Sequence, residues 1–175
     1  MTLSRKLRLA ALAFLVAGTV GCDQTSKLAA RTALRQADSI LLSGGLIELR
    51  LAENPGSFLS LGAVLPEAVR SAVFTVGVGI GLIALTGYLA WRSRIDVIRF
   101  IGLSLVLAGG LSNLLDRVFQ HGLVTDFVTI HIGPLHTGIF NIADVLIMIG
   151  IGVITFGLWK SWPRDTPASR IERTS

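Results

Sequence analysis

Four long apolar stretches constrain this chain more than any other feature of its sequence. They cover about Leu7–Cys22, Val69–Trp91, Val97–Leu115 and Ile142–Trp162. A helix that crosses the hydrocarbon core of a bilayer needs roughly 20 mostly apolar residues, and the first stretch reaches that length only by continuing past Asp23 towards Leu28. The sequence therefore predicts an all-α membrane protein with four transmembrane helices. The second stretch is expected to pack closely through Gly77, Gly79, Gly81 and Gly87.

The composition agrees with a membrane location. Of the 175 residues, 51% are hydrophobic and 15% are charged, whereas an ordinary soluble domain carries about 25% charged residues. These values argue against a cytosolic enzyme and against a disordered chain. The net charge is +5, but no Lys/Arg-rich face with interleaved aromatic residues occurs, so nucleic acid is not expected as a partner. The single cysteine, Cys22, excludes an internal disulfide framework and a Cys-based zinc site.

Basic residues predict the orientation in the membrane. They gather before the first stretch, between the second and third, and after the fourth: Arg5, Lys6 and Arg8; Arg92, Arg94 and Arg99; Lys160, Arg164, Arg170 and Arg173. Because cytoplasmic loops carry an excess of Lys and Arg, we predict that both termini are cytoplasmic. The loops 23–68 and 117–140 then face the opposite side of the membrane. Residues 1–162 should form one membrane domain, and residues 163–175 a disordered tail.

The N-terminus allows a second interpretation. Basic residues, an apolar run and then Val20-Gly21-Cys22 are similar to a secretory signal that ends in a lipoprotein-type cysteine. Cleavage before Cys22 would remove the first span. The basic C-terminus and the remaining connections fit an even number of spans with both ends inside, so we expect the first span to be retained.

Short segments outside the spans predict a small β platform and a short helix on that opposite side. Leu46–Leu51 and Val124–Ile132 alternate as half-buried strands do. Asn54-Pro55-Gly56 and Gly133-Pro134 are typical turns. Ala29–Gln36 has helical character and no helix breaker. We expect these elements to lie together at the outer ends of the four helices.

Polar residues near bilayer depth are costly, so each is a candidate functional residue. Asp23 and Lys27 are four residues apart and can pair on one helix face, which would anchor the helix at the interface. Asn54 lies beside a Pro-Gly turn that could present its amide to a ligand backbone. On their own, both features are also explained by ordinary structural roles.

The third span ends in a polar segment, Ser112-Asn113-Leu114-Leu115-Asp116-Arg117. At helical spacing Gly110, Asn113 and Arg117 share one face. Asp116 stands beside Arg117, which would partly offset its charge, so a structural role is expected for Asp116. Arg117 could extend to the interface, but Asn113 is too short to do so.

Two further carboxylates suggest chemistry. Asp126 shares a predicted strand face with Val124 and Val128, and Asp144 begins the fourth span one turn after Asn141. Helix capping accounts for Asp144 but not for Asp126. Two carboxylates in a poorly hydrated place share one proton, and such a pair can deprotonate a water and protonate a leaving amine, as in aspartic proteases. A proton relay or a purely structural pair would use the same residues.

The three histidines, His121, His131 and His136, predict neither a metal site nor a cofactor. Their spacing matches no helical zinc motif, and we interpret them as solvated loop residues. The sequence also contains no Gly-rich phosphate loop and no Gly-x-Ser-x-Gly elbow.

Together these segments resemble the bacterial lipoprotein signal peptidase (signal peptidase II) family, from the first span to the fourth. Residues 23–27 match the family's Asp-Gln-x-Ser/Thr-Lys, and residues 113–117 match Asn-x-x-Asp-Arg. Residues 125–127 match x-Asp-Phe, and residues 140–144 match Phe-Asn-x-Ala-Asp. The order and the spacing of the motifs agree as well.

The resemblance implies an aspartic endopeptidase of the bacterial inner membrane, with its active site towards the periplasm. Such an enzyme cuts signal peptides from prolipoproteins just before the diacylglyceryl-modified cysteine, and its other partner is membrane lipid. The family's catalytic aspartates carry over to Asp126 and Asp144. Positions that bind substrate carry over to Asn54, Gly56, Asn113, Arg117 and Asn141, while Asp23, Lys27 and Asp116 become structural supports. A monomer without metal or cofactor is expected.

The chain departs from the family pattern near the expected substrate channel. Asn54-Pro55-Gly56-Ser57-Phe58 replaces Asn-x-Gly-Ala-Ala-Phe, Ser112 replaces a glycine, and Gly138-Ile139 replaces a turn that commonly contains proline. These changes spare both aspartates but affect the expected substrate preference. A proton-coupled transporter and a non-catalytic lipopeptide-binding module are the two alternatives.

Overall fold

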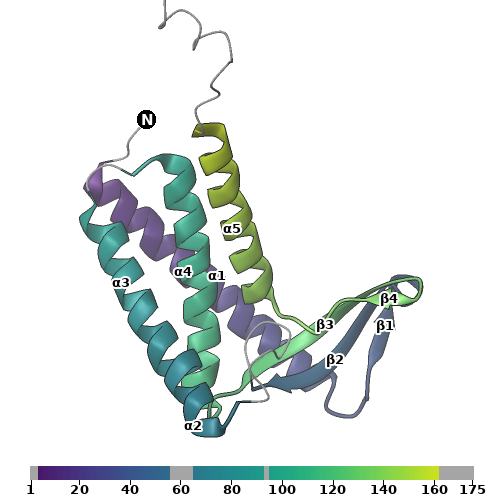
Figure 1. Ribbon diagram of the computed structural model, residues 1–175. Helices are drawn as coiled ribbons and strands as arrows, with labels where there is room; N and C mark the ends of the chain where they lie inside the picture. The colour runs from purple at the N-terminus through teal and green to yellow at the C-terminus, as the bar shows by residue number, and fades with distance from the viewer. Residues whose placement is uncertain (1–3, 56–64, 93–94, 162–175) are drawn as a thin grey trace, which may run out of the picture.

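The computed structural model describes residues 4–55, 65–92 and 95–161. The elements follow the order α1 (Arg5–Ala33), β1 (Ile40–Leu42), η1 (Ser43–Gly45), β2 (Ile47–Asn54), α2 (Glu67–Arg70), η3 (Ser71–Gly77), α3 (Val78–Trp91), α4 (Val97–Phe119), β3 (Val124–Ile132), β4 (Leu135–His136) and α5 (Ile142–Ser161). The start of α1 and the end of α5 lie at one end of a helix bundle, and the sheet leaves from the other end (Figure 1).

Four helices are long and apolar enough to cross a membrane: Arg5–Ala33, Glu67–Trp91, Val97–Phe119 and Ile142–Ser161. They include the four predicted spans, except that Trp162 lies outside the described residues. The second spanning helix joins α2, η3 and α3, and its η3 segment is π-helical. The first helix is longer than predicted. It continues to Ala33, so most of the expected short helix at 29–36 is the end of α1.

Glycines bring α4 and α5 into close contact. A Cβ atom on Gly102 would lie 2.6 Å from Ile154 Cγ1 and 2.8 Å from the Gly150 carbonyl oxygen, and one on Gly109 would lie 2.6 Å from the Ala143 carbonyl oxygen. Small residues allow such backbone approach between membrane helices. The close packing predicted for the glycines of the second span is not found at Gly79, Gly81 or Gly87. Added Cβ atoms on Gly81 and Gly87 would meet nothing within 4 Å, and one on Gly79 would only touch Leu114 at 3.7 Å.

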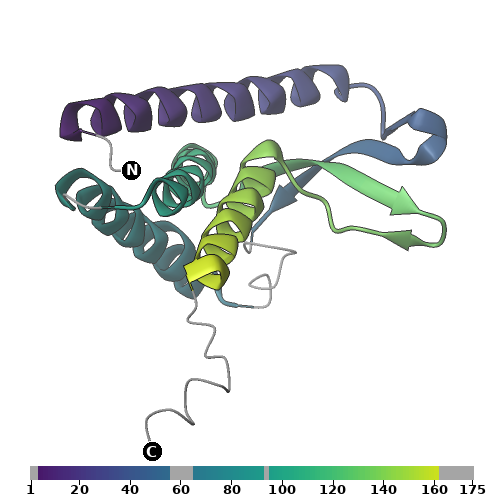
Figure 2. The same cartoon turned by 90° about the horizontal axis from the view of Figure 1, so that it is seen from above.

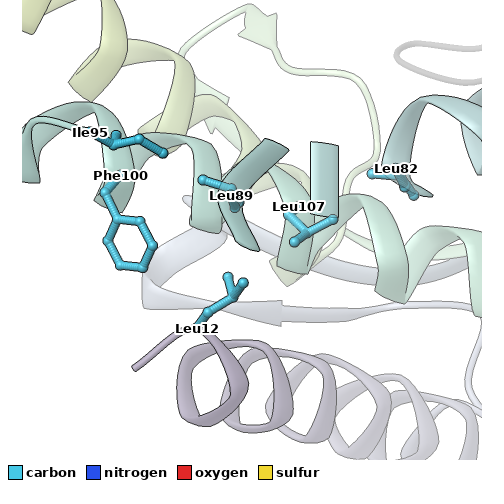
Figure 3. Close-up of a cluster of buried hydrophobic side chains, with 6 residues drawn as sticks. All are labelled: Leu12, Leu82, Leu89, Ile95, Phe100 and Leu107. Carbon is cyan, nitrogen blue, oxygen red and sulfur yellow. The ribbon is translucent and has the colours of Figure 1, made fainter. Parts of the chain in front are cut away.

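A buried apolar cluster joins α1, α3 and α4 (Figure 3). It consists of Leu12, Leu82, Leu89, Ile95, Phe100 and Leu107. Seen from above, α4 lies among the other spanning helices while α1 extends past the bundle towards the sheet (Figure 2). The α4 helix therefore has the most buried side chains of the four, and it is the helix whose polar end meets the sheet.

The sheet has the strand order β1-β2-β3-β4 with antiparallel neighbours. The predicted strand Val124–Ile132 is confirmed as β3, and the predicted strand at 46–51 corresponds to β2, which continues to Asn54. Ala52 pairs with Asp126 and Asn54 with Val124, after an irregularity in the register between Leu49 and Ala52. This pairing places Asn54 next to Asp126 at the end of the sheet that meets the helices.

Candidate active site

One cavity collects the predicted polar residues where the sheet meets the bundle. Its volume is about 270 Å³. Its polar lining consists of Asn54, Asn113, Arg117, Asp126 and Asp144, and its apolar wall of Val78, Leu82, Val106, Gly110, Val124, Ile147 and Met148. Side chains from α3, α4, α5, β2 and β3 therefore surround a single space. The predicted common face of Gly110, Asn113 and Arg117 is confirmed, because all three line this space.

Asp126 projects from β3 and is only 1% exposed. Its Oδ2 accepts a hydrogen bond from Asn54 Nδ2 at 2.8 Å, and its Oδ1 accepts one from Asn141 Nδ2 at 2.7 Å. Burial raises the pKa of Asp126 to about 6, and the charge of Asp144 acts in the same direction. The donors Asn54 and Asn141 and the charge of Lys27 oppose the rise. This carboxyl group can therefore exchange a proton near neutral pH.

Asp144 lies in the first turn of α5 and forms a reciprocal cap with Asn141. Asn141 Oδ1 accepts from the Asp144 backbone N–H at 3.0 Å, and Asp144 Oδ2 accepts from the Asn141 backbone N–H at 3.2 Å. This is the pattern of a capping box, so the capping role that the sequence suggested for Asp144 is confirmed. The second oxygen, Oδ1, accepts from Asn113 Nδ2 at 2.9 Å. The cap therefore fixes the carboxylate in the wall of the cavity.

Two asparagines connect the two carboxylates. Asn141 Nδ2 lies 2.7 Å from Asp126 Oδ1 and 3.2 Å from Asn113 Oδ1, while Asn113 Nδ2 donates to Asp144. Asn113 Oδ1 also accepts from Lys27 Nζ at 3.1 Å. Both asparagines are buried. A chain of hydrogen bonds thus runs from Asp126 to Asp144 and holds both groups around one space.

Lys27 of α1 forms a buried ion-pair cluster beneath the site. Its Nζ lies 2.6 Å from Asp23 Oδ2 and 2.9 Å from Asp116 Oδ2, and the three side chains are at most 3% exposed. The predicted pairing of Asp23 with Lys27 is confirmed, but the pair is buried inside the protein and does not form an interfacial anchor. Arg117 interacts electrostatically with Asp116, as predicted, but the direct ion pair of Asp116 is with Lys27.

Hydrogen bonds satisfy the remaining oxygens of the two supporting carboxylates. Asp23 accepts from Ser112 Oγ at 2.7 Å and from the Ala143 backbone N–H at 2.8 Å. Asp116 accepts from Gln24 Nε2 at 2.9 Å and from the Thr125 backbone N–H at 3.1 Å. Sequence reasoning missed these roles of Ser112, Gln24 and Thr125. The only signal was their position inside or beside the polar motifs.

Arg117 is buried at 7% exposure and does not extend to the interface. Its Nη1 donates to the Asn113 carbonyl oxygen at 3.3 Å. Its Nε has no hydrogen-bond acceptor within the described part of the chain. A buried guanidinium on the cavity wall therefore has donor capacity left for a ligand.

The remaining predictions concern Gly56 and the histidines. Gly56 lies outside the described residues. His131 is not a solvated loop residue: its Nε2 lies 2.9 Å from Glu48 Oε2 and its ring packs on His136 at a centroid distance of 5.7 Å. Within residues 4–55, 65–92 and 95–161, no group of three or more His, Cys, Asp or Glu side chains could hold a metal ion.

Comparisons with known proteins agree on one family. A family model described as "Signal peptidase (SPase) II" matches residues 5–160. A "Lipoprotein signal peptidase" of Syntrophus aciditrophicus is 33% identical over 129 residues, which are 74% of this chain and 80% of the relative. A protein of the same name from Desulforapulum autotrophicum is 33% identical over 138 residues, 78% of this chain and 84% of the relative.

A solved structure has a similar fold. It is a bacterial membrane enzyme determined by the in meso method at 2.3 Å resolution, with a TM-score of 0.76 and 26% sequence identity. The similarity covers 90% of this chain and 93% of the other. The likeness therefore extends over nearly the whole of both chains.

Proposed function

This chain belongs to the signal peptidase II family, and we propose that Asp126 and Asp144 are its catalytic pair. It is a multi-pass membrane aspartic peptidase that removes signal peptides from prolipoproteins. The observation that carries the proposed pair is the shared cavity: both carboxylates line it, and Asn113 and Asn141 connect them.

In the proposed reaction the pair holds one proton at a time. The ionised carboxylate takes a proton from the attacking water, while the protonated one donates its proton to the carbonyl oxygen. When the tetrahedral intermediate collapses, the carboxylate that took the water proton gives it to the departing amine, and a hydroxyl of the intermediate returns a proton to the other carboxylate, so the pair again holds one proton. Asp126 suits the role of the initial proton holder, because burial raises its pKa to about 6. The apolar wall of Val78, Leu82 and Ile147 limits hydration, which keeps the two groups coupled.

We assign substrate binding to the polar residues around the pair. The guanidinium of Arg117 offers an unused Nε–H to a carbonyl or anionic group of the substrate. Asn54 and Asn113, which line the cavity, orient the carboxylates and lie within reach of the substrate backbone. Asn141, assigned to substrate by the sequence resemblance, is instead fully buried behind the cavity and orients Asp126. Gly56, which lies outside the described residues, is assigned to substrate binding on the family motif alone. In this proposal Asp23, Lys27 and Asp116 position α1 against α4 and do not touch substrate. The scissile bond lies just before a diacylglyceryl-modified cysteine.

We further propose that the protein is a monomer in the bacterial inner membrane, with both termini cytoplasmic and the site facing the periplasm. The support is that the start of α1 and the end of α5 share one end of the bundle (Figure 1). Arg5, Lys6 and Arg8 belong to the start of α1 and Lys160 to the end of α5, which fits the excess of Lys and Arg on the cytoplasmic side. In a Cys22→Ser background, a membrane-impermeant thiol reagent applied from outside should label Asp38→Cys and not Lys6→Cys.

Cleavage of a diacylglyceryl prolipoprotein by the purified protein tests the function. Asp126→Asn and Asp144→Asn keep the shape of the side chain but remove proton exchange, so each should lower kcat by roughly 10²–10⁴ or more. The double variant should be little worse than either single variant, because groups that act as a unit are not additive. Asp38→Asn, at an exposed carboxylate, is the matched control. Full activity of either active-site variant would reject the pair.

A further inference from the structure

A second cavity lies on the other side of Asp144. It has a volume of about 300 Å³ and runs between α5 and the segment 137–140 that leads into this helix. Its lining consists of Thr137, Gly138, Ile139, Phe140, Asp144, Val145, Met148 and Ile149. Asp144 and Met148 also line the catalytic cavity. The first two turns of α5 therefore separate two spaces that meet at a proposed catalytic carboxylate.

The second cavity differs from the first in its chemistry. Apart from Asp144 and Thr137 its side chains are apolar, and no Lys, Arg or His of the described residues lines it. Val145, Met148 and Ile149 are 41%, 53% and 49% exposed on a helix that can span the membrane. The cavity is therefore an apolar crevice that begins at Asp144 and opens towards lipid.

We propose that this crevice holds an acyl chain of the diacylglyceryl group on the substrate's cysteine. The proposal rests on the proposed function. If cleavage occurs just before that cysteine, the glyceryl group lies within one residue of the scissile carbonyl and hence beside Asp144. A chain that leaves from there needs an apolar path that starts at the carboxylates and opens to the bilayer. The catalytic cavity, which also contains Arg117 and Asn113, then remains for the peptide.

The expected benefit of this site is positional. An acyl chain in the bilayer is already surrounded by hydrocarbon, so entering the crevice adds little hydrophobic stabilisation. Holding the chain between Phe140 and Ile149 instead fixes the adjacent cysteine relative to Asp144, and small errors in such positioning can cost large factors in rate. The crevice should therefore act on the reactivity and apparent affinity of lipidated precursors.

Photocrosslinking can locate the chain without relying on turnover. A lipidated precursor peptide with a diazirine in one acyl chain is bound to the Asp126→Asn variant, illuminated, and the adducts are mapped by mass spectrometry. We expect adducts on Val145, Ile149 and residues 137–140. Adducts on Val78 and Leu82 instead would place the chain in the catalytic cavity and reject the proposal. Equal labelling of Ile151, or equal labelling of the crevice by a diazirine phospholipid, would show an unspecific lipid surface and also reject it.

A matched pair of substitutions tests the effect on catalysis. Ile149 and Ile151 lie on α5 with nearly equal exposure, 49% and 48%, but only Ile149 lines the crevice. Ile149→Trp should raise KM for the lipidated precursor about tenfold or more, while Ile151→Trp should stay within about twofold of the unmodified enzyme. Equal kinetics of the two variants would reject the crevice and leave the peptidase function intact. Failure of the unmodified enzyme to cleave the precursor would reject the proposed function itself.

Discussion

Replacing Lys27 with methionine should destabilise the protein by about 3–5 kcal/mol, the usual cost of breaking a buried ion pair. Methionine keeps the length of the side chain but removes the cation that lies 2.6 Å from Asp23 and 2.9 Å from Asp116. At an effective dielectric constant of about 20, each lost attraction has a magnitude of about 6 kcal/mol. Hydrogen bonds from Ser112 and Gln24 to the two carboxylates remain and limit the net loss.

Unfolding by SDS in mixed micelles, followed by circular dichroism, measures this cost. Lys160→Met is the control, because Lys160 lies on the exposed end of α5 and its loss should change little. Asp116→Asn should cost less than Lys27→Met, about 1–3 kcal/mol, and should leave turnover in the molecules that fold. The double variant Lys27→Met/Asp116→Asn should be more stable than the sum of the two single effects predicts. Unchanged stability of Lys27→Met would refute the stabilising role of the buried ion pairs that Lys27 forms.

Three further predictions concern the cavity and the helix contact. Asn54→Ala removes a hydrogen-bond donor that favours ionised Asp126, so the pKa of Asp126 should rise above about 6. The limb of the pH–rate profile that reports this pKa should then move to higher pH, and an unshifted limb would contradict the assignment. Arg117→Lys keeps the charge but loses the planar fork, so kcat/KM should fall about 10–100-fold, and unchanged kinetics would show that Arg117 does not hold substrate. Gly102→Ala should destabilise the protein by about 1–3 kcal/mol through overpacking against Ile154; thermal unfolding should show no such loss for Gly87→Ala, where an added Cβ meets nothing within 4 Å.

The four spans and the two main strands could be predicted because each follows a local periodicity or a long apolar run. Val124–Ile132 alternates over nine residues and forms β3 with the same bounds. The strands β1 and β4 have three and two residues, too few to produce a detectable alternation. Their position depends on pairing with β2 and β3, which is a tertiary effect.

The partners within the site were less predictable than its members. The spacing of Asp23 and Lys27 indicates a pair within one helix, because helical neighbours are four residues apart. Nothing local reveals that Lys27 also reaches Asp116, which is 89 positions further along the chain and on another helix. Ser112 illustrates the same limit. In the sequence, Ser112 is recognisable only as a departure from the glycine of the family motif. In the structure, its hydroxyl donates a hydrogen bond to Asp23.

The network around Lys27 also has a consequence for the order in which the protein is made. Asp23 and Lys27 belong to the first helix to be synthesised, whereas Asp116 lies in α4 and the amide of Ala143 that donates to Asp23 lies at the start of α5. The first helix therefore enters the membrane with Asp23 and Lys27 able to pair only with each other, because their partners on α4 and α5 do not yet exist. The network closes only after the ribosome has passed residue 143, so the tolerance of these charges in the membrane is a property of the finished bundle and of no single helix.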